Sequence, residues 1–198
     1  MQTGDIILFS DTTFLPSRII EFASQSIYSH IGIIVKDILG LPNDKIFILE
    51  STGFSDIPDA LDSKIKWGVQ IRAFEKVKNE YNGRIFHRAL SCDRTAEFYE
   101  TLEKVYSFVH DKSYNTSPVE WFNLLIGKEV IDEDSLSSHT SFVCSSLVAF
   151  IYKNLDLIST HEFSLARPKD FGTEDFGADK RRVTFINCIL DKEIIQLL

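Results

Sequence analysis

Three short, isoleucine-rich apolar runs near the start of the chain restrict its fold more than any other feature. They lie in Gly4–Phe9 (GDIILF), Ser29–Asp37 (SHIGIIVKD) and Lys45–Ser51 (KIFILES). Each run is nearly continuous instead of alternating between apolar and polar residues. Continuous runs are typical of strands that are covered on both faces. The sequence therefore predicts a sheet whose two faces are both buried.

Further patterns add strands to the first half of the chain and helices to the second half. Phe98, Leu102, Val105 and Val109 recur at helical spacing, which predicts an amphipathic helix within residues 93–111. Other patterns predict helices at 15–26 and 117–127, strands at 67–74, 83–90 and 183–190, and a polar turn at 78–83. No repeat or change in composition marks a second domain. We expect a single α+β domain of residues 1–198.

Charge and composition argue against several classes of protein. A net charge of −8 disfavours a nucleic-acid surface, because neutralising phosphates requires clustered lysine and arginine. No apolar run approaches the roughly 20 residues that a membrane-spanning helix needs. The first residues show no secretion signal. We therefore expect a protein without a transmembrane segment or nucleic-acid partner, located in the cytoplasm or, if viral, in the host cytoplasm or virion.

The three cysteines, Cys92, Cys144 and Cys188, are odd in number and widely spaced. Without a C-x-x-C pair, the sequence indicates neither a zinc site nor a disulfide framework. We expect no cofactor, no disulfide and no metal among the three cysteines, and ordinary thiols at Cys92 and Cys188.

Cys144 opens an apolar helical pattern, and two interpretations of it compete. It shares a helical stripe with Val148 and Ile151, which favours burial in a core. Thr140 and Ser141 are good N-cap candidates, however, and they would place Cys144 in the first turn. There, free backbone N–H groups and the helix dipole stabilise a thiolate and can receive an oxyanion. The acidic segment 127–140 leads into this helix, so we expect it to border any cleft there and to disfavour anionic substrates.

A histidine interrupts the apolar pattern at the start of the second run. His30 is followed by Gly32, which lies on the same face of a strand and leaves room beside the ring. A lone histidine in such a place is more often a core residue than a base. Glu50, at the end of the third run, favours the interpretation of His30 as a base, because a carboxylate on a neighbouring strand can orient an imidazole. Tyr28 is close enough to approach a substrate, with packing in the core as the alternative.

Taken in order, these segments resemble a known family. The chain presents a Gly-Asp-apolar strand (GDIILF), a His-x-Gly strand (SHIGIIV), Glu50, and only then the cysteine helix (FVCSSLVAF). NlpC-type members of the papain-like cysteine peptidase superfamily have the same modules with the cysteine helix first. The rotated order resembles the circularly permuted branch, which includes bacterial YiiX-like proteins and a poxvirus relative. The segments GVQIRAFEKV, YNGRIFHRAL and ARPKDF also resemble that branch, so the similarity covers nearly the whole chain.

The resemblance implies a permuted papain-like fold, with an antiparallel sheet or small barrel packed against the cysteine helix. It implies a thiol hydrolase that cleaves an amide bond through an acyl-enzyme, with Cys144 as nucleophile, His30 as base and Glu50 as third member. The lecithin:retinol acyltransferase group is also similar to this branch, so lipid acyl hydrolysis or transfer is an alternative. A non-catalytic binding module or scaffold is another, because fold does not fix function. The implied partner is a small-molecule, peptide or lipid-derived acyl substrate; the sequence does not indicate the oligomeric state.

Overall fold

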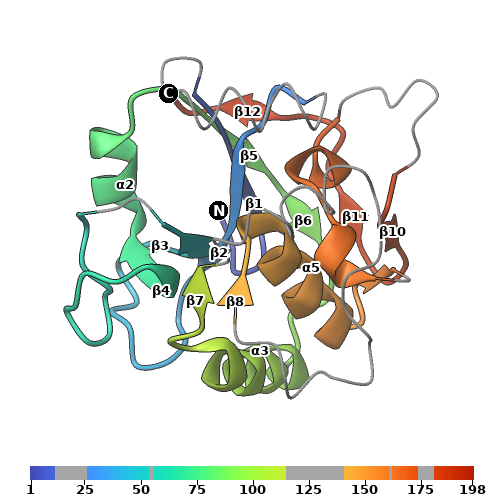
Figure 1. The fold of residues 1–198 in the computed structure, drawn as a ribbon. Helices are drawn as coiled ribbons and strands as arrows, with labels where there is room; N and C mark the ends of the chain where they lie inside the picture. Colours follow the sequence, from blue (N-terminus) through green and yellow to red (C-terminus); the bar gives the residue numbers. More distant parts are fainter. Residues whose placement is uncertain (12–25, 54–55, 115–140, 161, 174–180) are drawn as a thin grey trace.

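The three apolar runs form the middle of an antiparallel sheet. The computed structural model describes residues 1–11, 26–53, 56–114, 141–160, 162–173 and 181–198 (Figure 1). Its central sheet has six strands in the order β12-β5-β1-β2-β3-β4. These are β1 (Ile6–Ser10), β2 (His30–Val35), β3 (Phe47–Thr52), β4 (Gly68–Ala73), β5 (Arg84–Arg88) and β12 (Ile195–Gln196). Every neighbouring pair is antiparallel, and the predicted α+β class with an antiparallel sheet is confirmed.

Both faces of the sheet are buried, as the continuous apolar runs predict. Side chains alternate along a strand, so Ile6 and Leu8 of β1 enter one hydrophobic cluster while Ile7 and Phe9 enter another. The helices among the described residues are α2 (Phe74–Glu80), α3 (Ala96–Val109) and α5 (Cys144–Asn154). Helices α3 and α5 contribute to the larger cluster, and α2 contributes to the smaller one. The sheet therefore separates two hydrophobic clusters.

Three two-stranded ladders accompany the central sheet. They join β7 (Ser113–Tyr114) to β8 (Ser141–Phe142), β6 (Leu90–Ser91) to β11 (Ile189–Leu190), and β9 (Ile158–Ser159) to β10 (Thr184–Phe185). Two 3-10 turns, η2 (Phe163–Leu165) and η3 (Pro168–Phe171), follow β9. The β7–β8 ladder is parallel, and β8 leads into α5 with one residue between them. This ladder therefore sets the position of the helix that carries Cys144.

Two local predictions are wrong. Segment 78–83 is not a turn between neighbouring strands, because α2 occupies part of it and β4 and β5 lie at separate places in the sheet. Phe74 and Val77 are three residues apart and both join the smaller cluster, a spacing that one helical turn satisfies. The predicted last strand, 183–190, is divided into β10 and β11, which pair with different partners.

The amphipathic helix predicted within 93–111 is confirmed as α3. Its N-cap, Thr95, accepts a hydrogen bond from the Phe98 N–H at 3.3 Å. The helices predicted at 15–26 and 117–127 and the acidic segment 127–140 lie outside the described residues, apart from Ser26. No helix in the described part of the chain is long and apolar enough to cross a membrane.

Candidate active site

Cys144 is the first residue of α5 and is 5% exposed. Val143 is the extended N-cap residue, and the Ser146 hydroxyl accepts a hydrogen bond from its N–H at 3.1 Å and donates one to its carbonyl at 3.0 Å. The N-cap predicted at Ser141 is wrong, because this residue belongs to β8; Thr140, the other candidate, lies outside the described residues. The thiol nevertheless lies at the helix N-terminus, where unpaired N–H groups and the dipole stabilise negative charge.

The start of α5 is anchored to the central sheet through β8. The Ser51 hydroxyl of β3 donates a hydrogen bond to the Phe142 carbonyl at 2.7 Å. On its other side, β8 pairs with β7, with Ser113 opposite Ser141 and Tyr114 opposite Phe142. Two elements distant in sequence therefore fix the chain two residues before the thiol.

His30 is the first residue of β2, and the charge of the Cys144 thiol is among the causes that raise the pKa of its imidazole. The ring also contacts Phe9, with centroids 5.2 Å apart. By strand alternation, His30 shares a face with Ile34 of the smaller cluster, whereas Cys144 belongs to the larger cluster. Each of the two residues stands at the first position of its element, His30 in β2 and Cys144 in α5. The imidazole remains partly accessible, with 21% of the side chain exposed.

Glu50 holds the far side of the imidazole. Its Oε2 atom is 2.5 Å from Nε2 of His30, which leaves Nδ1 as the ring nitrogen for Cys144. The Oε1 atom accepts two hydrogen bonds from Arg72, from Nε at 2.8 Å and from Nη2 at 2.5 Å. Glu50 is fully buried and Arg72 nearly so. The structure thus brings Cys144, His30 and Glu50 together and adds a fourth member, Arg72.

The sequence analysis did not identify Arg72, although a charged residue within an apolar strand pattern points to a buried partner. The residue lies in β4, within the mostly apolar segment 67–74, where a charged side chain requires a buried partner. The register supplies that partner, because Arg72 lies opposite Ile48 and Gln70 lies opposite Glu50 on the neighbouring strand. Only the pairing of β3 with β4 makes Glu50 the partner, and the sequence does not specify that pairing.

The charges of this group shift the pKa values of two members. Burial alone would lower the pKa of His30, but the charge of Cys144 and hydrogen bonds with Cys144 and Glu50 raise it to about 10. Burial alone would raise the pKa of Glu50, but the Arg72 guanidinium and His30 hold it below its usual value. The site therefore favours a charged imidazolium between two acidic groups.

Gly32 lets β2 and β3 pack closely instead of leaving open space. A Cβ atom at this position would lie 2.7 Å from Cδ1 of Ile48 and 3.1 Å from Cβ of Glu50. The room that the sequence suggested beside His30 is therefore filled by the neighbouring strand. A larger residue at Gly32 would push Glu50 away from the imidazole.

Tyr28 packs in the core, and a different tyrosine lies close to the thiol. Tyr28 is 3% exposed and makes an edge-to-face contact with Phe86, with centroids 5.6 Å apart. Its ring also lies against Gly172. Tyr114, on β7, packs over Gly53, and burial together with the charge of Cys144 raises its pKa. Tyr114 is therefore a better candidate than Tyr28 for a side chain that approaches the reacting thiol.

A second histidine–carboxylate pair has a structural role. Asp5 Oδ2 lies 2.8 Å from Nε2 of His87, while Oδ1 accepts hydrogen bonds from the Leu90 N–H at 3.0 Å and from Nη2 of Arg94 at 3.1 Å. Asp5, directly before β1, is thus bonded to residues of β5 and β6 and to Arg94. The Asp5–His87 pair therefore connects elements of the fold. The histidine of the candidate site is His30.

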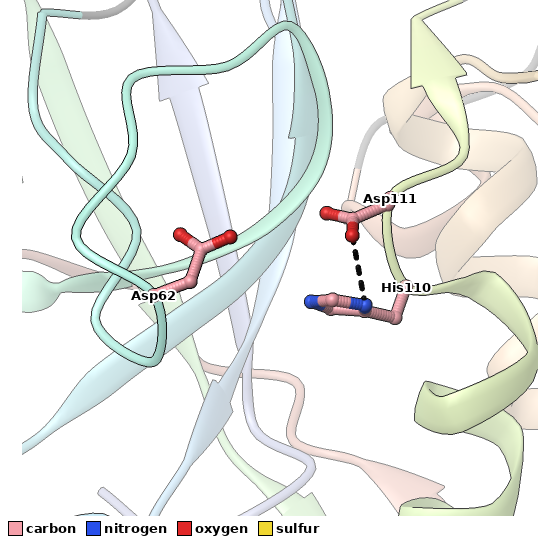
Figure 2. A group of neighbouring side chains, drawn as sticks. All are labelled: Asp62, His110 and Asp111. Atoms are coloured by element: carbon pink, nitrogen blue, oxygen red, sulfur yellow. Dashed lines mark ion pairs between the residues drawn. The ribbon is translucent and has the colours of Figure 1, made fainter.

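Asp62, His110 and Asp111 form a cluster of the kind that can hold a metal ion. Figure 2 shows their side chains facing one another from the segment before β4 and from the end of α3. Their ligand atoms lie within 4.8 Å of one another. However, Nζ of Lys66 lies 3.3 Å from Asp62, 2.7 Å from Asp111 and 3.2 Å from Asp59. Because the Lys66 ammonium is already paired with both carboxylates of the cluster, a divalent cation would have to displace it, and the cluster with Lys66 in place does not fit one.

Comparison with known proteins identifies a similar fold. No family model matches the chain, and no curated protein matches it. The crystal structure of the metalloprotein YiiX from Escherichia coli O157:H7 is similar, with a TM-score of 0.51 and 22% sequence identity. The similarity covers 78% of this chain and 66% of YiiX, so the chain spans slightly less than two thirds of that neighbour. At this identity the likeness supports a YiiX-like fold and nothing beyond the fold.

Proposed function

We propose that residues 1–198 form one permuted papain-like domain that hydrolyses an amide bond through an acyl-enzyme on Cys144. The observation that carries this proposal is an imidazole that a buried carboxylate holds at 2.5 Å and whose pKa is raised by a thiol at a helix N-terminus. Nucleophile, base and orienting group in this arrangement are the components of covalent acyl transfer. The YiiX-like fold is consistent with the proposal, and the order of the modules along the chain resembles that of the permuted branch.

In the proposed mechanism, the reacting form of the pair has the Cys144 proton already on Nδ1 of His30, and in the first step the thiolate attacks the carbonyl carbon of the substrate. The resulting imidazolium is stabilised by Glu50, which Arg72 keeps ionised. The raised pKa of His30 supports this assignment, because it favours the protonated ring beside a thiolate. Helix α5 contributes its positive dipole end at the same point.

The oxyanion of the tetrahedral intermediate is placed at the backbone N–H groups of the first turn of α5. These groups have no partner within a helix and point toward its N-terminal end. His30 then donates its proton to the leaving amine, the C–N bond breaks, and the acyl group remains on Cys144 as a thioester. Water attacks this thioester with His30 again as base, which releases the acid and regenerates the thiol.

No step of this mechanism passes through a metal ion. The similar protein YiiX is described as a metalloprotein. In this chain, the described residues that could bind a metal are Asp62, His110 and Asp111, and the Lys66 ammonium lies among their carboxylates. We therefore do not carry the metal of YiiX over to this chain.

The test is an intact-mass measurement after incubation with matched amide, ester and thioester acyl donors. We expect a covalent acyl adduct on the unmodified protein and on Cys92→Ala and Cys188→Ala, and no adduct on Cys144→Ala. The ranking of the three donors then separates an amidase from a lipid-directed acyl hydrolase or acyltransferase. Equal modification of all three thiols, or no adduct with any donor, would instead indicate a binding module.

A further inference from the structure

The two remaining cysteines face each other across the β6–β11 ladder. In this antiparallel pair, Leu190 lies opposite Leu90 and Ile189 lies opposite Ser91. Continuing the same register by one residue places Cys188 opposite Cys92. The wide spacing of these cysteines along the chain concealed the relationship, which arises only because the C-terminal segment returns to β6.

The hydrogen-bond pattern shows whether Cys92 and Cys188 form a hydrogen-bonded or a non-hydrogen-bonded pair of the ladder. The Asp191 N–H donates to the Ala89 carbonyl at 2.9 Å, on the far side of the Leu90–Leu190 pair. In an antiparallel ladder, bonded and non-bonded pairs alternate, so Leu90–Leu190 is non-bonded and the next non-bonded position is Cys92–Cys188. At such positions, Cα atoms approach to about 4.5 Å and both side chains project from the same face. That separation lies within the range that a disulfide spans.

The surroundings of the two thiols agree with this proximity. Both residues are partly buried and pack against the larger cluster, and both sulfurs are free. Burial raises the pKa of Cys188 to about 11, and the charge of Cys92 contributes to the same shift. Burial also raises the pKa of Cys92, but the nearby Arg94 opposes the increase. Cys92 is therefore the better nucleophile of the pair, and Cys188, which donates to the Leu157 carbonyl at 3.3 Å, is the resolving thiol.

We propose that Cys92 and Cys188 are a redox pair that closes into a cross-strand disulfide on exposure to a small-molecule disulfide such as glutathione disulfide. The Cys92 thiolate attacks one sulfur of glutathione disulfide and releases one glutathione. Cys188 loses its proton to solvent and attacks the Cys92 sulfur of the mixed disulfide, releasing the second glutathione. Two protein thiols are oxidised and one glutathione disulfide is reduced to two glutathione thiols.

This inference is independent of the proposed hydrolase activity, because neither thiol contacts the Cys144–His30–Glu50 group in the described structure. The bond would attach the C-terminal segment, which carries β11 and the edge strand β12, to the chain at β6. Closing so long a loop restricts the unfolded chain, so oxidation should raise the thermal midpoint by several degrees, roughly 5 °C.

The experiment uses the full chain with Cys144→Ala, so that only the two thiols remain. After removal of reductant, the protein is equilibrated with glutathione disulfide and measured by intact mass and peptide mapping. We expect the loss of two hydrogens, a linked peptide containing Cys92 and Cys188, and an increased thermal midpoint that dithiothreitol reverses. The unmodified protein, mapped in parallel, should give the same linked peptide.

Two matched variants test the order of attack. In the Cys144→Ala background, Cys188→Ser should stop at a stable glutathione adduct on Cys92, while Cys92→Ser should react more slowly, at Cys188. The proposal is overturned if the protein with both cysteines retains glutathione adducts without a linked peptide. It is equally overturned if both thiols remain free at an excess of oxidant, or if the link joins two copies of the chain.

Discussion

Arg72 donates two hydrogen bonds to a single oxygen of Glu50, at 2.8 and 2.5 Å, and leaves the other oxygen to His30. Because one oxygen of Glu50 bonds to Arg72 and the other to His30, Arg72 is a positioning residue. It fixes the plane and the charge of the Glu50 carboxylate, which in turn orients the imidazole. Lysine cannot reproduce the arrangement, since its ammonium is a single point of contact on a flexible stem.

Replacing Arg72 with Met should destabilise the protein and shift the titration of the site. The change leaves Glu50 buried without its cationic partner, which should cost at least about 3 kcal/mol in the free energy of unfolding. The pKa of Glu50 should rise, since the guanidinium is the largest of the influences that lower it. Urea unfolding measures the first effect, and the pH profile of alkylation at Cys144 measures the second. Arg84→Met on β5 is the control, and a profile unchanged in Arg72→Met would remove the positioning role.

The imidazole of His30 should remain protonated through neutral pH. Its pKa is raised from an ordinary value of 6.5 to about 10, so the proton is retained below that pH and lost as the pH rises through it. In Cys144→Ala the pKa should fall toward the ordinary value, because the charge and the hydrogen bond of the thiol are removed. NMR titration of the labelled imidazole measures both, with His110→Gln used for assignment. A midpoint near 6.5 in the unmodified protein would contradict the proposed ion pair.

Glu50→Gln should impair turnover less than Cys144→Ser does. The carboxylate orients the base, whereas the sulfur forms the covalent bond. In comparable triads, the orienting acid counts for less than the nucleophile by roughly 10- to 100-fold in kcat. Steady-state kinetics on the best acyl donor from the mass screen provide the measurement. Equal losses from the two substitutions would mean that Glu50 takes a direct part in the reaction.

Lys66→Met should convert the cluster around Asp62 and Asp111 into a cation site. Without the ammonium group, the carboxylates repel one another, and stability should fall by on the order of 2 kcal/mol, between the values for exposed and buried pairs. Added Mn²⁺ or Zn²⁺ should bind the variant and restore part of the loss, while the unmodified protein should not respond. Calorimetry and thermal unfolding test this, with the exposed Lys64→Met as control. Stoichiometric binding at this cluster in the unmodified protein would show that Lys66 does not exclude metal.

The sequence was sufficient to predict the parts of the site that depend on local pattern. Continuous apolar runs identified β1, β2 and β3, and the polar residues that end or interrupt such runs are His30 and Glu50. The role of Arg72 could not be predicted from local pattern, because it depends on the pairing of β3 with β4. The start of α5 was misplaced because a serine inside the helix, Ser146, supplies the capping contact in place of a residue before it.

The opposition of Cys92 and Cys188 could not be predicted for a related reason. The ladder that joins β6 to β11 contains two residue pairs, which is too short to leave a periodic pattern in the sequence. The same holds for β7 and β8, which fix the chain two residues before Cys144. Short ladders between segments that are distant in the sequence therefore determine much of the geometry of the candidate site and of the cysteine pair.

The order of the elements has a consequence for the synthesis of the protein. His30, Glu50 and Arg72 lie on β2, β3 and β4, which are consecutive in the sequence and adjacent in the sheet. Cys144 comes much later, on a helix that packs against strands already made. Because chains emerge from the ribosome N-terminus first, the charged partners can assemble before the thiol is translated. Under the proposed mechanism, a nascent chain has no hydrolase activity until α5 has been made, and a product truncated before α5 would keep the base and its supports without the thiol that they activate.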